Sequence, residues 1–202
     1  HPNIVQFRES VAGSTECQLV MDYCSRGELF AYNAEIHEFR MPFPLVRRFF
    51  SETVNGVAHL HSLKIAHRDI SLENILLDDD FHCRLCDFGL ATRKGSWCQG
   101  SVGKLFYMAP EVYANTKYYD GRKADLWSLG VLLYIMLTGQ PPPFGYTTPS
   151  REFRSIERAD LDKLSTGVDL PIAAMDLLLR LLRFHPNQRI SIQKVTSDAG
   201  SL

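Results

Sequence analysis

The sequence predicts an α+β fold, in which short strands are followed by a mainly helical carboxyl-terminal half. Short apolar runs bounded by turn residues occur in the first 90 positions and predict the strands. Longer segments with apolar residues at helical spacing predict the helices, and they dominate after residue 120. The chain has 202 residues, of which 45% are hydrophobic and 22% charged, so a sizeable core in about one domain is expected.

The predicted elements of the amino-terminal half are a strand, a helix and a hairpin. Residues 17 to 23 form an apolar run that predicts a buried strand, and turn residues follow at 24 to 27. From 45 to 61 the apolar residues recur every three or four positions, which predicts a helix with one core-facing side. Residues 75 to 77 and 83 to 86 flank three aspartates, and we expect two short strands joined by a solvated turn. Such a hairpin brings its two ends close together.

Two more helices are predicted in the carboxyl-terminal half. Residues 124 to 138 are apolar on nearly every side, which is typical of a helix buried in a large core. Gly139 and the prolines after it end this helix. A last helix is expected from about 172 to 184, before His185-Pro186. No repeat, low-complexity tract or linker divides the chain.

Charge and cysteine content narrow the classes of function. The chain has 22 Lys plus Arg, 23 Asp plus Glu and a net charge of −1, so no basic excess predicts a nucleic-acid partner. The longest apolar run, 131 to 137, is too short for a membrane span. Five cysteines without framework spacing favour a reducing, intracellular and cytoplasmic setting. Cys83 and Cys86 have the spacing of half a zinc site, but no second pair follows, and we expect core residues.

Residues that can carry chemistry gather at the mouth of the predicted hairpin. His67-Arg68-Asp69 and Asn74 precede it, and Asp87-Phe88-Gly89 follows it. Asp69 can accept a hydroxyl proton. Asn74 and Asp87 offer the hard oxygen ligands that Mg²⁺ prefers when phosphates complete its octahedron. A base beside a metal is what phosphoryl transfer needs.

Three further features follow in the chain: Ala109-Pro110-Glu111, the motif at 125 to 130, and Arg189 near the carboxyl terminus. Together with the motifs around Asp69, they resemble eukaryotic protein kinases over essentially the whole chain. The segments at 27 to 30 and 129 to 139 look like serine/threonine kinases of the calcium/calmodulin type. The resemblance implies a mainly helical large lobe plus the last strands of a small β lobe. It divides the chain into small-lobe residues 1 to 23, a hinge at 24 to 27 and the large lobe at 28 to 202.

Because the sequence opens in mid-pattern at His1, we expect that an amino-terminal segment is missing. That segment would hold the phosphate-covering loop, the ATP-anchoring Lys and its Glu partner of the resembling family. The chain alone is then expected to bind nucleotide poorly, to expose the apolar strand faces that the missing lobe would cover, and to transfer little or no phosphate.

By the same resemblance, the parent protein transfers the γ-phosphoryl group of ATP to serine or threonine hydroxyls of protein substrates, with Mg²⁺. Asp69 positions and deprotonates the substrate hydroxyl, while Asp87 and Asn74 hold the metal ions. Glu111 and Arg189 form an ion pair, and Asp125 holds the catalytic loop. The nucleotide site is assigned to Met21 behind the adenine, to Asp22, Tyr23 and Cys24 in the hinge, to Glu28 near the ribose, to Leu76 as the floor and to Cys86 at the back.

Two positions depart from the family pattern. Ser71 stands where serine/threonine kinases have a Lys that contacts the transferring phosphate, and Lys104 stands where they have a Thr. Since both positions face the same path from hydroxyl to phosphate, we hypothesise a swapped site. In it Lys104 supplies the charge and Ser71 the hydroxyl. A weakened or inactive enzyme is the alternative.

Arg68 beside the catalytic Asp69 implies regulation by an upstream activating kinase. A phosphate on Ser96 or Ser101 could bind this guanidinium and order the segment between Asp87 and Glu111. Two other functions stay open. A kinase-like scaffold needs none of the three oxygen-bearing residues, and a small-molecule phosphotransferase does not need the Ala109-Pro110-Glu111 segment.

Overall fold

The computed structural model describes residues 1–13, 15–39, 41–93, 97–142 and 170–202. Within these ranges the strands form two separate two-stranded antiparallel sheets. One pairs β1 (Phe7–Ala12) with β2 (Cys17–Met21), and the other pairs β3 (Ile75–Leu77) with β4 (Cys83–Leu85). The described helices are α1 (Leu29–His37), α2 (Phe43–Ser62), α3 (Pro110–Tyr113), α4 (Gly121–Thr138), α7 (Ile172–Leu181) and α8 (Ile192–Ala199).

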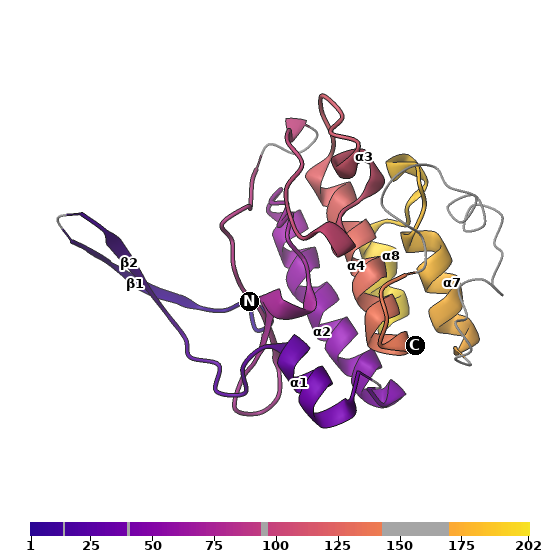
Figure 1. The fold of residues 1–202 in the computed structure, drawn as a ribbon, viewed down its shortest axis with the longest axis horizontal. Coiled ribbons are helices and arrows are strands. Elements are labelled where there is room, and N and C mark those ends of the chain that lie inside the picture. The colour runs from indigo at the N-terminus through magenta and orange to yellow at the C-terminus, as the bar shows by residue number, and fades with distance from the viewer. Residues whose placement is uncertain (14, 40, 94–96, 143–169) are drawn as a thin grey trace.

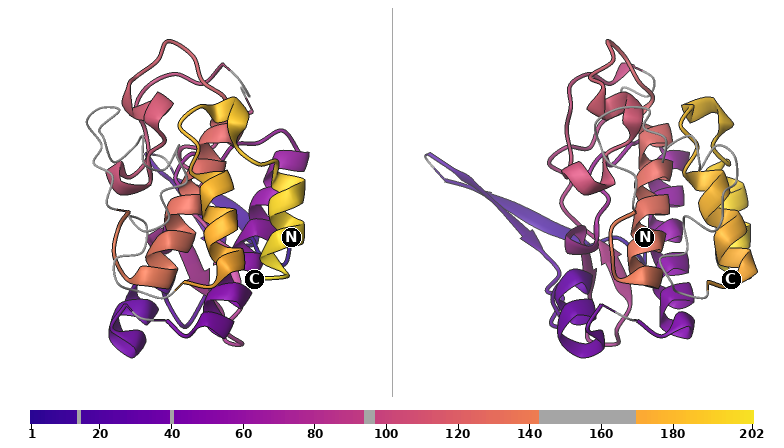
Figure 2. Two further views of the ribbon diagram at one scale, coloured as in Figure 1. Left: turned by 90° about the vertical axis from the view of Figure 1, so that its right-hand side faces the viewer. Right: turned by 45° about the vertical axis from the view of Figure 1, so that its right-hand side comes forward.

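The helices form one body, and α4 runs through its centre (Figures 1 and 2). Helix α2 packs against both α4 and α8, and α4 also packs against α7. The buried side chains of α2 recur every three or four residues, as a helix with one core-facing side requires. In α4 almost every residue is buried, including Trp127, Leu129 and Tyr134. The two helices predicted over 45 to 61 and 124 to 138 are therefore confirmed.

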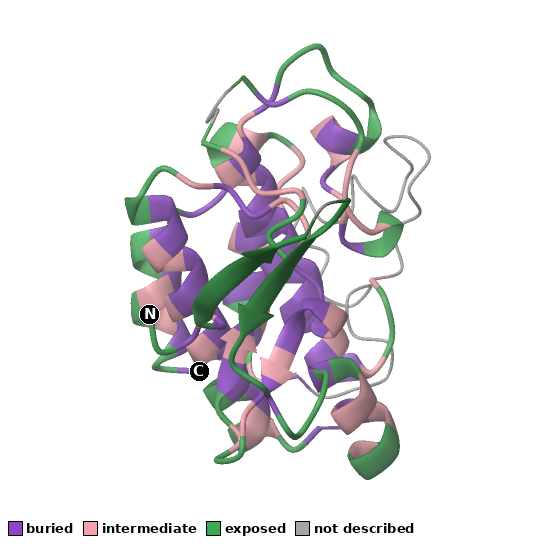
Figure 3. Cartoon of the chain, turned by 90° about the vertical axis from the view of Figure 1, so that its left-hand side faces the viewer, coloured by how far each residue is buried: buried purple, intermediate pink, exposed green. Residues whose placement is uncertain are grey.

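Strand β2 forms within the predicted range, but it is exposed, whereas its apolar run had indicated a buried strand. Its exposure agrees with the expectation that the chain alone leaves apolar strand faces uncovered. Every residue of β1 and β2 is exposed, including Leu19 and Met21. The two strands pair with each other and project from the helical body as a ribbon (Figures 1 and 3). Apolar sequence alone predicted burial, whereas burial depends on what packs against the strand. We refer to these two strands, Phe7–Ala12 and Cys17–Met21, as the ribbon.

The predicted hairpin of β3 and β4 is present and buried. Ile75 pairs with Leu85, Leu77 pairs with Cys83, and all four side chains are nearly inaccessible to solvent. Asp78 accepts backbone N–H bonds from Asp80 and His82, which closes the turn.

Several short elements were not predicted, and one predicted helix is too long. Strand β1 and helices α1, α3 and α8 are present although no pattern was assigned to them. The last predicted helix ends at Leu181 instead of 184. No helix in the described ranges is both long enough and apolar enough to cross a lipid bilayer.

Candidate active site

The buried carboxylate of Asp125 in α4 binds the backbone of the loop that carries Asp69. Its two oxygens accept the backbone N–H groups of His67 and Arg68 at 2.9 and 2.8 Å. Arg68 adopts a left-handed conformation, with φ of 72°. A non-glycine residue in this region is strained, and such strain persists only where the surroundings hold it. Asp125 therefore fixes the turn that presents Asp69, as the kinase resemblance implied.

His67 links this loop to the segment after the hairpin. Its ring lies 3.0 Å from the Cys86 carbonyl and meets the Phe88 ring edge-on, with 5.1 Å between the centroids. Burial lowers the pKa of His67 and outweighs the neighbouring carboxylates that raise it. The neutral ring donates to that carbonyl, and the Cys86 N–H binds the Asn74 carbonyl at 3.0 Å. These contacts place the residues before Asp87 against the loop that holds Asp69.

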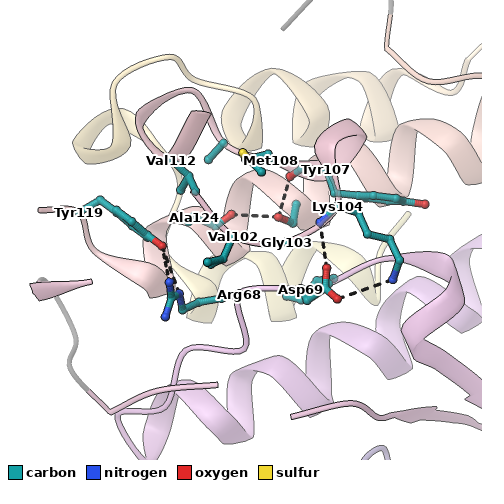
Figure 4. Close-up of a pocket in the computed structure, with 13 residues that line it drawn as sticks. Arg68, Asp69, Val102, Gly103, Lys104, Tyr107, Met108, Val112, Tyr119 and Ala124 are labelled. Carbon is teal, nitrogen blue, oxygen red and sulfur yellow. Dashed lines mark hydrogen bonds and ion pairs between the residues drawn. The ribbon is translucent and has the colours of Figure 1, made fainter. Parts of the chain in front are cut away.

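Two hydrogen bonds fix the Asp69 carboxylate, and a third holds its backbone carbonyl. Asn74 Nδ2 donates to the Asp69 carbonyl at 2.7 Å and to its Oδ2 at 2.8 Å, and the Lys104 backbone N–H binds Oδ1 at 3.0 Å. The chain reaches this position through Gly103, whose φ is 95°. A Cβ there would lie 2.6 Å from the Arg68 carbonyl oxygen, so only glycine allows this approach. Asp69, Gly103 and Lys104 line a small pocket, in which Figure 4 shows Asp69 facing Lys104.

The two exchanged positions, Ser71 and Lys104, meet in the structure. The Lys104 ammonium donates to Ser71 Oγ at 2.9 Å and to Asn74 Oδ1 at 3.1 Å, and it lies 3.7 Å from Asp69 Oδ2. Ser71 is fully buried, whereas Lys104 is half-buried. The cation thus lies in the cluster of polar atoms around the candidate base.

The two candidate metal ligands differ in their exposure and in the hydrogen bonds that they already make. Asp87 is exposed and left-handed, with φ of 57°, and its Oδ1 accepts the Gly89 N–H at 3.1 Å. Asn74 is buried, and its amide oxygen already accepts from Lys104. The carboxylate and amide oxygens match what Mg²⁺ prefers. Use of the Asn74 oxygen as a ligand requires the Lys104 ammonium to share it or to move.

The residues assigned to the nucleotide fall into two groups. Glu28 and Leu76 pair across an isolated bridge, and the thiols of Cys24 and Cys86 lie near them. Burial, followed by the charge of Asp87, raises the pKa of the Cys86 thiol to about 11. The other three lie at or after the end of the ribbon: the Met21 and Tyr23 side chains are exposed, and Asp22 forms an ion pair with Arg8.

A buried ion pair supports the far side of the site. Arg189 donates to both carboxylate oxygens of Glu111 at 2.7 Å, and its side chain is completely inaccessible to solvent. Arg189 also donates to three backbone carbonyls, those of Lys123, Arg183 and Phe184. The pair that the sequence predicted from the kinase resemblance is present.

Arg68, predicted to receive a phosphate, already has partners in the structure. Its guanidinium binds the Tyr119 hydroxyl and the Gln99 carbonyl. Ser101 is exposed, and its hydroxyl contacts the Met108 sulfur at 3.2 Å, while Ser96 lies outside the described residues. Sequence reasoning missed Tyr119, because nothing in the pattern around it indicates that it faces a residue 51 positions earlier.

Comparison with known proteins agrees with this geometry. The family profile described as the protein kinase domain matches residues 1–199. The serine/threonine-protein kinase SAPK2 of Oryza sativa subsp. indica is 40% identical over 96% of this chain and 58% of its own length. The testis-specific serine/threonine-protein kinase 5 of Mus musculus is 36% identical over 100% of this chain and 55% of its own length. The serine/threonine-protein kinase SRK2C of Arabidopsis thaliana is 38% identical over 100% of this chain, which spans 60% of that relative.

Proposed function

The chain belongs to the protein kinase family, and from that premise we propose that its parent protein phosphorylates serine or threonine hydroxyls of protein substrates with ATP. The observation that carries the proposal is the carboxylate of Asp69, held by Asn74 and by the Lys104 N–H with a lysine ammonium beside it. The names of the relatives, which are serine/threonine kinases, support the choice of hydroxyl.

In the proposed reaction Asp69 orients the substrate hydroxyl and takes its proton as the oxygen attacks the γ-phosphorus. The bond from that phosphorus to the bridging oxygen breaks, and ADP leaves with the electron pair. Mg²⁺, when bound, would neutralise charge on the phosphates. Asp87 and Asn74 are the residues that would hold it, and their oxygen donors suit this ion.

Lys104 is proposed to supply the positive charge near the transferring phosphoryl group. Its ammonium lies 3.7 Å from Oδ2 of Asp69, the residue proposed to take the proton of the substrate hydroxyl. Ser71 is proposed to orient this ammonium, since its hydroxyl accepts from Nζ at 2.9 Å. A fixed cation aimed at developing negative charge stabilises the transition state more than the ground state.

The remaining assignments are part of the same proposal. Residues 1–23 belong to a small lobe, 24–27 to a hinge and 28–202 to a large lobe. The adenine and ribose contact Met21, Asp22, Tyr23, Cys24 and Glu28, and Leu76 and Cys86 line the pocket. Phosphorylation of a protein substrate fits an intracellular, cytoplasmic setting, in line with five free cysteines in the described residues.

The test measures phosphate transfer from labelled ATP to a serine/threonine peptide library, with the full-length protein. Asp69→Asn is expected to lower kcat by about 10²–10⁴-fold, the usual range for loss of a catalytic acid or base. Lys104→Ala keeps the backbone N–H that binds Asp69, so it removes the cation alone. We expect a loss in kcat of about 10²-fold or more.

Lys194→Ala, an exposed lysine on α8, is the matched control and should keep the wild-type rate. Near-normal turnover of Lys104→Ala would refute the role of this cation. A wild-type protein that binds Mg-ATP but phosphorylates no peptide would instead favour the scaffold.

A further inference from the structure

We propose that Tyr119 is a positioning residue whose hydroxyl holds Arg68 and the segment of residues 97–100, so that the catalytic geometry forms without a phosphate on that segment. This inference rests on the proposed kinase function, because it concerns the regulation of the same site. In this proposal the neutral side chain of Tyr119, just before α4, takes the place of the phosphate predicted on Ser96 or Ser101.

The Tyr119 hydroxyl forms three hydrogen bonds that join Arg68 to Gly100. Its oxygen accepts from Arg68 Nε at 3.1 Å and from Arg68 Nη2 at 2.8 Å, and its proton goes to the Gly100 carbonyl at 3.2 Å. Arg68 Nη2 also donates to the Gln99 carbonyl at 3.1 Å. Figure 4 shows the tyrosine and the arginine facing each other at one end of the pocket that holds Asp69 at the other. The phenol therefore bridges the catalytic loop and the segment.

The backbone around Tyr119 reinforces this bridge. Tyr119 and Cys98 exchange both of their N–H to carbonyl bonds, each at 3.1 Å, and the Trp97 and Tyr118 rings pack edge to face beside them. Gly121, at the start of α4, lies so close that a Cβ there would be 2.8 Å from the Ala66 Cβ and 3.0 Å from the Cys98 sulfur. Three stretches of the chain thus converge at Tyr119.

Both residues that the Tyr119 hydroxyl joins, Arg68 and Gly100, are close in the chain to residues that position Asp69. Arg68 precedes it in the chain, and Gly100 lies four residues before Lys104, whose N–H binds its carboxylate. A shift of residues 97–100 would move the Lys104 N–H and ammonium together away from that carboxylate. In the described part of the chain, the hydrogen-bond acceptors of the Arg68 guanidinium are neutral oxygens, so no negative charge is required to hold it. Burial raises the pKa of Tyr119, which keeps the phenol protonated and able to donate.

The experiment compares Tyr119→Phe with Tyr118→Phe in the full-length protein after phosphatase treatment. Tyr118→Phe removes the neighbouring hydroxyl and keeps the ring that contacts Trp97. We expect phosphatase-treated wild type to keep its turnover. Tyr119→Phe should lower kcat by about tenfold, since it removes a hydrogen bond to a charged group, while KM for ATP changes little.

Amide hydrogen exchange of residues 97–104 provides a readout that does not depend on turnover. We expect faster exchange in Tyr119→Phe, above all at Cys98, and no change in Tyr118→Phe. Wild-type kcat and exchange in Tyr119→Phe would overturn the inference, as would loss of wild-type turnover on phosphatase treatment. A wild type that phosphorylates no peptide would refute the proposed function, and the exchange data would still decide whether Tyr119 holds the segment.

Discussion

The two antiparallel sheets of this protein each contain a run of apolar residues, yet they lie in opposite environments. In the ribbon of β1 and β2 every residue is exposed, whereas four of the six residues in β3 and β4 are buried (Figure 3). Both contain runs of apolar residues, Leu19-Val20-Met21 in one and Ile75-Leu76-Leu77 in the other. Helices α1 and α2 pack against the hairpin, while the ribbon stands away from the helical body. Strand formation is thus a local property here, and burial is a property of the neighbours.

The ion pairs of the two regions differ in exposure in the same way as the sheets do. Arg8 of the ribbon pairs with Asp22, just after it, and their side chains are 62% and 42% exposed. Arg189 and Glu111 pair in the helical body with side chains that are 0% and 10% exposed. Water screens the first pair and is excluded from the second, and only the second is bidentate, so loss of the carboxylate should matter far more in the helical body.

The largest expected effect is on this buried pair. Glu111→Ala leaves the Arg189 charge buried without its carboxylate, which typically costs about 3–5 kcal/mol in the free energy of unfolding. Asp22→Ala removes the exposed partner of Arg8 and should leave that free energy unchanged within error. Urea unfolding followed by circular dichroism measures both, and equal effects would remove the contrast between the two regions.

A smaller effect is expected from matched leucines in the two sheets. Leu85→Ala creates a cavity at a residue that is 1% exposed, and we expect a loss of about 2–5 kcal/mol. Leu19 is 63% exposed, so Leu19→Ala should stay within about 0.5 kcal/mol. A similar loss for both would mean that the ribbon packs against something in solution, which thermal unfolding of the two variants would detect.

The smallest expected effect is a difference in the labelling rates of the cysteines, which needs no substitution to be measured. With iodoacetamide at pH 8, followed by mass spectrometry, we expect Cys17 on the ribbon to react well before the buried Cys83. Burial raises the pKa of Cys83 well above its usual value, which further lowers the reactive thiolate fraction.

The labelling of Cys86 should depend on pH in a defined direction. Its pKa is raised to about 11, so its thiolate fraction and labelling rate should climb by about tenfold per pH unit up to that value. A plateau near pH 9 would contradict the raised pKa. Labelling of Cys83 as fast as Cys17 would show that the hairpin opens.

Much of the candidate site was predictable because its residues are close in sequence or belong to motifs. Asp69 and Asn74 are five residues apart on one loop, and the hairpin between Asn74 and Cys86 brings Asp87 to the same place. The meeting of Ser71 with Lys104 was predicted from the family pattern, not from physical reasoning about the chain. The Tyr119 contact with Arg68 was not predictable, since neither residue type nor spacing distinguishes it from any other tyrosine.

By itself, the sequence determined the local properties of this protein: the helical periods of α2 and α4, the turn at Asp78 and the order of the motifs around Asp69. These follow from residue types within a few positions of one another. Only the tertiary structure decided which apolar strand is buried, which hydrogen-bond partners Arg68 has and how the Lys104 ammonium reaches Ser71. The two side-chain contacts join residues 33 and 51 positions apart, which meet through packing of the helical body, and no local pattern encodes such meetings.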